Sequence, residues 1–271
     1  MAQAWGPAVR YDYEGRVVLV TGGVRGVGAG ITRRFLAAGA TVVAGARGVP
    51  AAVPKVDGRR ADVVTADVRD PAEAAGLVEQ VVARHGRLDV VVNNAGGAPF
   101  ATADTASPRL HQRVVELNLL APLHVAQAAN RVMQEQEGGG SIIMIGSVSG
   151  VRPSPGTAAY GAAKAGLDNL ARSLAVEWAP RVRVNTVTVG LVQTESADLH
   201  YGDAEGVAAV ARTVPLGRMA CPEDVGDVCL YLGSAGAAYV SGASLLLHGG
   251  GERPAFLDAA TTNHAQSGSN A

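Results

Sequence analysis

Two side chains with complementary acid–base chemistry, Tyr160 and Lys164, lie four residues apart in the segment Tyr-Gly-Ala-Ala-Lys. On a helix this spacing places both side chains on one face, one turn apart. A free tyrosine has a pKa of about 10, and a neighbouring ammonium stabilises the phenolate and lowers that pKa. The pair therefore predicts a general acid/base. The alternative is an amphipathic helix whose lysine extends along the surface, because such pairs also recur by chance.

A glycine-rich turn follows the first apolar run of the chain. Residues 16–21 read Arg-Val-Val-Leu-Val-Thr, which is typical of a buried strand, and glycines follow at Gly22, Gly26 and Gly28 before a helix with an apolar face. Glycines let the backbone approach a phosphate closely, and a helix N-terminus favours negative charge. The pattern predicts a nucleotide phosphate site. A tight turn without a ligand is the alternative.

The second predicted strand, residues 41–45, bears on the choice of nucleotide. About 20 residues beyond the glycine turn, many NAD sites place an Asp or Glu on a ribose hydroxyl. This strand ends Ala-Gly-Ala and then Arg47, with no acid. Arg47, helped by Arg25 in the glycine turn, suits a 2′-phosphate, because guanidinium groups bind phosphate well. We therefore favour NADP(H) over NAD(H), which stays possible; the alternative is two solvated surface arginines.

Further apolar runs and helix signals complete an alternating pattern. Asp70-Pro71-Ala72-Glu73 is a helix start, with Asp as the cap and Pro in the first position. The polar segment Asn93-Asn94-Ala95-Gly96 marks the carboxyl edge of a sheet, where ligands bind in open α/β folds. The remaining predicted strands are residues 62–67, 88–92, 141–146, 183–188 and 244–247. The pattern predicts seven parallel strands with helices on both faces, joined by right-handed crossovers.

A proline interrupts the helix that begins at Ser107-Pro108. Pro122 lacks the amide hydrogen that would bond to the carbonyl four residues back, which belongs to Asn118. We expect a kink there, with the Asn118 carbonyl free to bind water. The alternative is that Asn118 is an ordinary polar helix residue and that Pro122 begins a second segment.

Composition narrows the functional classes. The chain has 271 residues, 48% apolar and 17% charged, with a net charge of −1. This length suits one large α/β domain or two small ones, the apolar content suits a sizeable core, and the charge gives no sign of nucleic-acid binding. We see no apolar stretch long enough to cross a membrane, no signal pattern in the first residues and no metal-ligand pair of histidines. Two cysteines, Cys221 and Cys229, do not make a disulfide framework, so we expect a cytoplasmic protein.

Taken in order, these motifs resemble the short-chain dehydrogenase/reductase family over residues 16–250. Within it, the chain is most similar to ketoacyl-reductase-like and to sugar- or steroid-alcohol-dehydrogenase-like enzymes. Each motif alone is weak, but their order along the chain is specific. The matching motifs are Thr21-Gly22-x-x-x-Gly26-x-Gly28, Asn93-Asn94-Ala95-Gly96, Asn118, Ser147, Tyr160-x-x-x-Lys164 and Asn185.

The resemblance implies roles for the matching residues. Tyr160 would pass a proton to or from the substrate oxygen, Ser147 would bind the substrate carbonyl, and Asn118 would hold a water in a proton relay. Lys164 would hold the nicotinamide ribose and depress the Tyr160 pKa, and Asp67 would lie near the adenine. The cofactor-binding residues implied are Gly22, Arg25, Gly26, Val27, Gly28, Arg47, Asp67, Val68, Asn94, Ala95, Gly96, Tyr160, Lys164, Gly190, Val192 and Thr194.

Two positions depart from the family pattern. After the sixth strand the family often has Pro-Gly, and this chain has Val189-Gly190. Near the C-terminus the family often reads Asp-Gly-Gly, and this chain has His248, which we interpret as structural, before its two glycines. Neither departure removes a catalytic group, and Thr194 is still placed to reach the cofactor.

The resemblance implies one doubly wound, Rossmann-like domain over residues 1–271. We expect a lead at 1–14, a substrate lid at 195–213 and a loose tail at 258–271. His200 and Tyr201 on the lid either contact substrate or only pack. Members of the family often form dimers or tetramers, so a homotetramer or homodimer is expected.

The function implied is an NADP(H)-dependent oxidoreductase that interconverts a carbonyl and a secondary alcohol. An NAD-dependent alcohol dehydrogenase of the same fold is the first alternative, and a non-catalytic dinucleotide-binding sensor is the second. The substrate is a small carbonyl or alcohol compound that the sequence does not name, because the same fold and catalytic set serve many substrates.

Overall fold

A seven-stranded parallel sheet forms the centre of the computed structural model, which describes residues 10–259. Its strand order is β5-β2-β1-β6-β7-β8-β9, so the order reverses between β1 and β6. The predicted α/β sheet and its seven strands are confirmed. The strands are β1 (Val17–Thr21), β2 (Thr41–Ala46), β5 (Asp62–Thr65), β6 (Val90–Asn93), β7 (Gly140–Ser147), β8 (Val182–Val189) and β9 (Ser244–Leu247).

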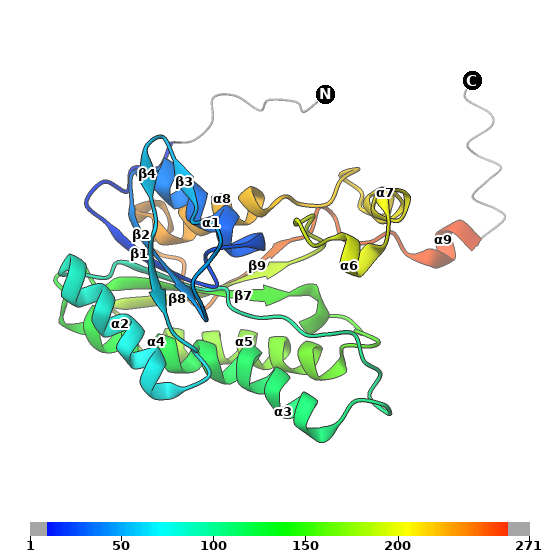
Figure 1. Cartoon of the computed structure of the whole chain (residues 1–271), viewed down its shortest axis with the longest axis horizontal. Coiled ribbons are helices and arrows are strands. Elements are labelled where there is room, and N and C mark those ends of the chain that lie inside the picture. Colours follow the sequence, from blue (N-terminus) through cyan, green and yellow to red (C-terminus); the bar gives the residue numbers. More distant parts are fainter. Residues whose placement is uncertain (1–9, 260–271) are drawn as a thin grey trace.

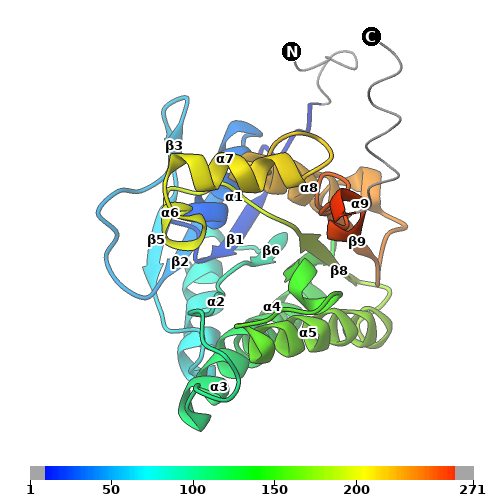
Figure 2. The same ribbon diagram turned by 90° about the vertical axis from the view of Figure 1, so that its right-hand side faces the viewer.

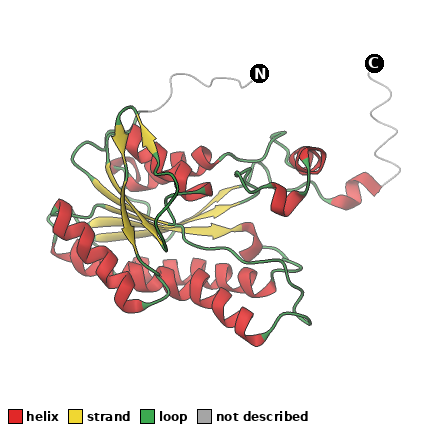
Figure 3. Ribbon diagram, in the orientation of Figure 1, coloured by secondary structure: helices red, strands yellow, loops and turns green. Residues whose placement is uncertain are grey.

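Helices cover both faces of this sheet (Figures 1 and 3). Alternate side chains of a strand point to opposite faces, so Leu19 packs in the apolar cluster with α2, α4 and α5, whereas Val18 and Val20 pack in the cluster with α1 and α8. The face with α1 (Gly26–Ala37) and α8 (Pro222–Gly233) is the upper one in Figure 1. The opposite face carries α2 (Pro71–His85), α4 (Ala121–Glu135) and α5 (Ala158–Glu177).

Local helix signals act as predicted at α2. The Asp70 carboxylate accepts hydrogen bonds from the amides of Ala72 and Glu73, at 2.7 and 3.2 Å. Pro71 occupies the first turn, and the helix ends at Gly86 in the left-handed conformation. The Glu73 side chain accepts from the amide of Asp67 instead of completing a box with Asp70. Its carboxylate therefore fastens the end of β5 to the start of the helix.

A π-helical turn stands at the interrupting proline, where the sequence predicted a kink. Between α3 (Pro108–Val115) and α4 lies a π-helical turn, Glu116–Leu120, in which the Ala121 amide bonds to the Glu116 carbonyl. Pro122 sits in the first turn of α4, where its missing amide hydrogen costs little. The π turn puts Asn118 inside the molecule, fully buried. The interruption at Pro122 is thus accommodated by widening one turn of a continuing helix.

The segments outside the seven-stranded sheet and its covering helices are short. A hairpin of β3 (Lys55–Val56) and β4 (Arg59–Arg60), which the sequence did not suggest, follows β2. Tyr13, in the predicted lead, is buried: its ring meets Phe35 edge to face at 5.0 Å and its hydroxyl donates to the Leu230 carbonyl. The rest of the predicted lead up to residue 9, and the predicted tail from residue 260, lie outside the described residues.

The predicted lid folds as two short helices, α6 (Asp198–Tyr201) and α7 (Ala204–Thr213). In Figure 1 the arrow of β7 points toward the side of the molecule where these helices lie. Figure 2 looks onto that side and shows α7 crossing above α6. A last helix, α9 (Ala255–Ala259), lies at the same end.

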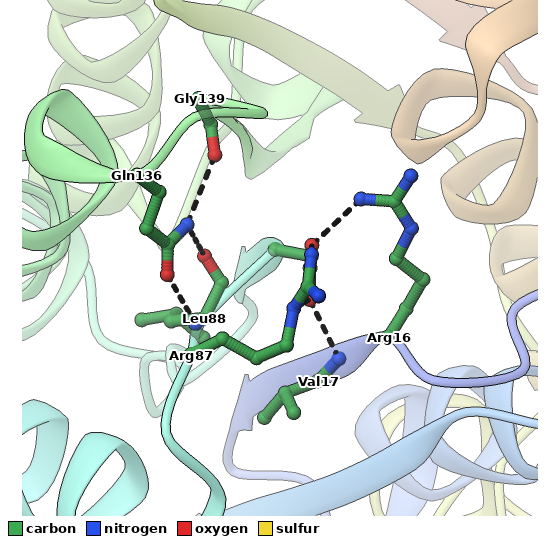
Figure 4. Close-up of polar contacts among 7 residues, drawn as sticks. Arg16, Val17, Arg87, Leu88, Gln136 and Gly139 are labelled. Carbon is green, nitrogen blue, oxygen red and sulfur yellow. Dashed lines mark hydrogen bonds and ion pairs between the residues drawn. The ribbon is translucent and has the colours of Figure 1, made fainter.

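A buried carboxylate ties the strands together at the opposite, amino edge of the sheet. Asp89, 7% exposed, accepts hydrogen bonds from the guanidinium groups of Arg16 and Arg87 and from the amide of Val17, at 2.6–2.9 Å (Figure 4). Next to it, Gln136 binds both the amide and the carbonyl of Leu88. Burial by itself raises the pKa of Asp89, but its hydrogen bonds outweigh burial and hold the pKa below the ordinary 3.8.

We predict that Asp89→Asn lowers the free energy of unfolding by about 1–3 kcal/mol at pH 7, because the amide cannot satisfy both arginines and the Val17 amide. A folded-state pKa below 3.8 means that the carboxylate stabilises the fold above that pH and that this contribution disappears as the pH falls through the folded pKa. Urea unfolding at several pH values measures both effects.

Glu14→Gln is the matched control for Asp89→Asn, because Glu14 pairs with Arg59 but is 67% exposed. An exposed ion pair contributes about 0–1 kcal/mol. If Glu14→Gln lost as much stability as Asp89→Asn, the role of the buried Asp89 carboxylate would be contradicted. The same holds if the stability lost in Asp89→Asn did not become smaller at acid pH.

Candidate active site

The predicted site segments meet because each one follows a strand of the same parallel sheet. Gly22 follows β1, Arg47 follows β2 and Asn94 follows β6, while Ser147 ends β7 and Gly190 follows β8. In the register of the sheet Thr21 is opposite Gly45 and Ser147 is opposite Val189, so these ends lie at one edge. The edge contains the point between β1 and β6 where the strand order reverses, which is where open α/β sheets bind ligands.

An elongated cleft of about 790 Å³ runs along this edge. Of the residues predicted for the site, Asp67 and Asn118 are not among those that line it, and the others are. The predicted residues in its wall are Gly22, Arg25, Gly26, Val27, Gly28, Arg47, Val68, Asn94, Ala95, Gly96, Ser147, Tyr160, Lys164, Gly190, Val192 and Thr194.

The glycine turn fits a dinucleotide phosphate. Gly22 has a φ of +65°, a conformation that favours glycine, and a Cβ on Gly28 would lie 2.1 Å from the Gly22 carbonyl oxygen. Asn94 fastens the same turn, since its side-chain amide donates to the carbonyls of Thr21 and Gly22 at 2.9 and 3.3 Å. The turn therefore brings the backbone of the α1 N-terminus close to the cleft.

The end of the cleft near β2 carries positive charge. Arg25 and Arg47 both line it, at the glycine turn and after β2. Asp67 directs its carboxylate to its own neighbour: Arg69 donates to it from the backbone amide at 3.1 Å and from the guanidinium Nε at 2.9 Å. The hydrogen bond from the Arg69 side chain is the main cause that lowers the Asp67 pKa, and Arg47 adds to the effect. Arg47 thus lies near enough to Asp67 to act on its charge.

Tyr160, Lys164 and Ser147 meet at the other end of the cleft. The Lys164 ammonium donates to the carbonyl of Ile145 at 2.8 Å and lies 5.6 Å from the centre of the Tyr160 ring. Ser147 lies near enough to Tyr160 to lower the pKa of the tyrosine, and its hydroxyl accepts a hydrogen bond from the Ser149 amide at 3.2 Å. Ser147 stands at the end of β7 and the other two on one face of α5, as their spacing predicts. A serine and a tyrosine side chain therefore line the same cleft as a buried cation.

Burial controls the protonation of this group. It raises the pKa of Tyr160, and the hydrogen bond from Ser147 offsets only part of the increase. It also lowers the pKa of Lys164 to about 8. Burial therefore outweighs the decrease in the Tyr160 pKa that was expected from Lys164, because desolvation disfavours the phenolate and the ammonium is engaged by Ile145. At neutral pH the tyrosine is a protonated hydroxyl, which is the form of a general acid.

Asn118 supports the site from behind. Its carboxamide oxygen accepts from the Gly97 amide at 2.9 Å, and its nitrogen donates to the carbonyls of Gly97 and Val114, also at 2.9 Å. A Cβ on Gly96 would lie 2.7 Å from the Asn118 oxygen and 3.3 Å from Lys164 Nζ. The side-chain carboxamide of Asn118 is thus hydrogen-bonded to the backbone after β6. A water held by this residue would therefore bind its main-chain carbonyl.

The segment after β8 forms one wall of the cleft. Val192 forms an isolated bridge with Ala220, and a Cβ on Gly190 would lie 2.7 Å from His248 Cβ. His248 therefore packs against the turn after β8, which agrees with a structural role. Glu195, next to the predicted Thr194, also lines the cleft and accepts a hydrogen bond from the Gly26 amide. Glu195 was predicted as the first residue of the lid and not as part of the cofactor site, and only its position directly after Thr194 signals that second role.

Of the two lid residues singled out from the sequence, His200 and Tyr201, the structure places the side chain of Tyr201. Burial and nearby Glu252 raise its pKa, and Arg152 lowers it. Arg152 in turn forms an ion pair with Glu252 at 2.6 Å. The side chain of His200 lies outside the described residues.

Two classes of feature are missing from the described part of the chain. Within residues 10–259 no group of three or more His, Cys, Asp and Glu side chains is placed to hold a metal ion. Among the helices in that range, none combines the length and the apolar character needed to span a membrane.

Comparisons with known proteins agree with this geometry. The sequence profile described as enoyl-(acyl carrier protein) reductase matches residues 22–252. A 3beta-hydroxysteroid dehydrogenase of Eggerthella lenta is 35% identical, over 88% of this chain and 94% of its own. The 3-oxoacyl-(acyl-carrier-protein) reductase of Escherichia coli is 34% identical, over 88% and 98%. The solved structure of a short-chain dehydrogenase/reductase of Serratia marcescens has a TM-score of 0.80 and 30% identity, over 89% and 99%.

We predict that Lys164→Met removes a pH-dependent increase in stability between about pH 8 and pH 10.5. With a folded pKa near 8 and an ordinary pKa of 10.5, the unfolded chain binds the extra proton in this window, so rising pH stabilises the wild-type fold. From pH 7 to pH 9.5 the wild type should gain about 1–2 kcal/mol relative to Lys164→Met, at roughly 1.4 kcal/mol per pKa unit.

Denaturant unfolding at both pH values measures this difference. The chain has one other lysine, Lys55, which is exposed, so Lys55→Met is the matched control and should follow the wild type. A constant difference between wild type and Lys164→Met across the window would contradict a buried, perturbed ammonium.

Proposed function

Because the chain belongs to the short-chain dehydrogenase/reductase family, we propose that it is an NADP(H)-dependent oxidoreductase that interconverts a carbonyl and a secondary alcohol. The observation that carries the proposal is that Ser147 and Tyr160 line the same end of one cleft as buried Lys164, and that this cleft suits a dinucleotide. When bound, the nicotinamide cofactor supplies or accepts the hydride.

In this proposal Tyr160 handles the proton. During reduction the carbonyl oxygen takes the proton of the Tyr160 hydroxyl while the carbonyl carbon gains the hydride, and during oxidation the proton returns. Burial keeps the Tyr160 hydroxyl protonated at neutral pH, which supports its use as the acid. Reduction is therefore the direction that we favour.

Ser147 and Lys164 have positioning and electrostatic roles in the same proposal. Ser147, which lines the cleft with Tyr160, would donate to the substrate oxygen and hold it within reach of the tyrosine. The Lys164 ammonium would stabilise the phenolate left after proton transfer and bind the ribose hydroxyls. Asn118 would keep the Gly96–Gly97 backbone in place behind both groups, and its carbonyl would bind the relay water.

Arg47 and Arg25 support the preference for NADP(H). Both line the end of the cleft near β2, where a dinucleotide places its adenosine ribose, and two guanidinium groups suit a 2′-phosphate. The alternative is an NAD-dependent dehydrogenase of the same fold.

The assembly we propose is a homodimer or homotetramer. Two apolar side chains near the C-terminus are exposed, Leu246 on the edge strand β9 and Phe256 in α9, and exposed apolar side chains of this size favour contact with a second copy. The two cysteines are unpaired, which supports a reducing, cytoplasmic setting.

We predict that Tyr160→Phe lowers turnover by about 100- to 10,000-fold, the usual contribution of a general acid, while the Kd for the cofactor changes only slightly. Oxidation of NADPH, followed by absorbance with a panel of ketones, measures turnover, and calorimetric titration measures binding. Tyr239→Phe removes an exposed hydroxyl far from the cleft and should keep full activity. Wild-type turnover in Tyr160→Phe would refute the mechanism.

We predict that Arg47→Ser raises the KM for NADPH about tenfold and leaves the KM for NADH nearly unchanged, because only NADPH has the 2′-phosphate that Arg47 would bind. Steady-state kinetics with the two cofactors side by side test this. Arg131→Ser, on the exposed side of α4, is the control for loss of one positive charge. An equal effect of Arg47→Ser on both cofactors would count against the NADP(H) preference.

A further inference from the structure

Helix α1 begins without a capping group of its own. The residue before its first turn, Arg25, makes no side-chain hydrogen bond to that turn, and the turn contains no acidic residue. The first amides of a helix have no acceptor inside the helix, and the helix dipole is positive at this end. An anion from elsewhere is therefore stabilised at the start of α1.

Glu195, in the segment after β8, provides such an anion. Its Oε1 accepts a hydrogen bond of 2.7 Å from the amide of Gly26, the first residue of α1, which is 169 positions earlier. Thr194 approaches the same glycine, since a Cβ on Gly26 would lie 3.8 Å from its methyl carbon. Both residues line the cleft, and the contact is exposed to solvent, so the carboxylate can leave without disturbing a packed core.

We propose that Glu195 sets the affinity of the dinucleotide site by competing with the pyrophosphate of the cofactor for the N-terminus of α1. The inference rests on the proposed function, because a dinucleotide bound in this cleft places its pyrophosphate at that helix end. A carboxylate and a pyrophosphate cannot both accept from the Gly26 amide, and their like charges repel each other at this distance. Binding therefore requires the Glu195 carboxylate to leave Gly26.

The exchange also affects the segment that leads into α6. The Ala197 amide donates to the Thr194 carbonyl at 3.1 Å and the Ser196 amide to its hydroxyl at 3.3 Å, so Glu195 is held within a compact turn directly before Asp198, the first residue of α6. Release of the carboxylate removes the contact that fastens this turn to α1. Cofactor binding is thereby coupled to the position of the predicted lid.

The test is calorimetric titration of the full-length protein with NADPH. Glu195→Gln keeps the shape of the side chain and a hydrogen-bond acceptor but removes the charge. We expect its Kd for NADPH to be about threefold to tenfold lower than that of the wild type, the range expected for one charge near a helix terminus. Glu195→Ala should shift the Kd in the same direction. Glu205→Gln makes the same charge change on the exposed surface of α7 and should bind like the wild type.

A Kd that is unchanged or higher in Glu195→Gln would overturn the inference while leaving the proposed function in place. Failure of the wild type and all variants to bind NADPH would overturn the proposed function and this inference with it. Hydrogen exchange of the Gly26 amide in cofactor-free protein adds a readout that needs no binding. Exchange should be faster in Glu195→Ala than in the wild type, and equal exchange would exclude the contact on which the competition depends.

Discussion

The parallel alignment of the strands is the constraint on which the site depends. Because every crossover returns the chain to the same edge, the segments after β1, β2, β6, β7 and β8 converge although they are far apart in sequence. The opposite edge has a different task. There the Asp89 carboxylate joins the starts of β1 and β6 through hydrogen bonds to Arg16, Arg87 and the Val17 backbone. One edge thus concentrates stabilising polar contacts, and the other keeps its backbone and side chains available to a ligand.

Low solvent exposure determines the electrostatics of the acid–base group. Lys164 is buried and Tyr160 is partly buried, so the pKa of the tyrosine rises and that of the lysine falls. Low exposure thus favours the uncharged form of each side chain. Because the pKa of Lys164 is still about 8, its ammonium persists at neutral pH and donates to the Ile145 carbonyl. A proton leaving Tyr160 would create a phenolate next to that ammonium, and each charge would then compensate the burial cost of the other.

The two ends of the cleft differ in the way they handle negative charge. At the α1 end, backbone amides and Arg25 attract anions, and the structure places the carboxylate of Glu195 among them. At the Tyr160 end the available groups are hydroxyls and a single buried cation. A dinucleotide with a charged pyrophosphate and a neutral carbonyl substrate match this division. Glu195 lies at the α1 end, and the turn that contains it leads directly to the helices of the predicted lid.

The sequence by itself determined the strands, the glycine turn, the Asp70 cap and the shared face of Tyr160 and Lys164, because hydrophobic periodicity, capping and helical spacing act over a few residues. Only the tertiary structure decided the features that depend on packing between distant segments. These are the π turn that buries Asn118, the burial that raises the Tyr160 pKa, and the contact of Glu195 with Gly26. Desolvation and contacts across 169 residues have no local signature, since they depend on which surfaces the folded chain brings together.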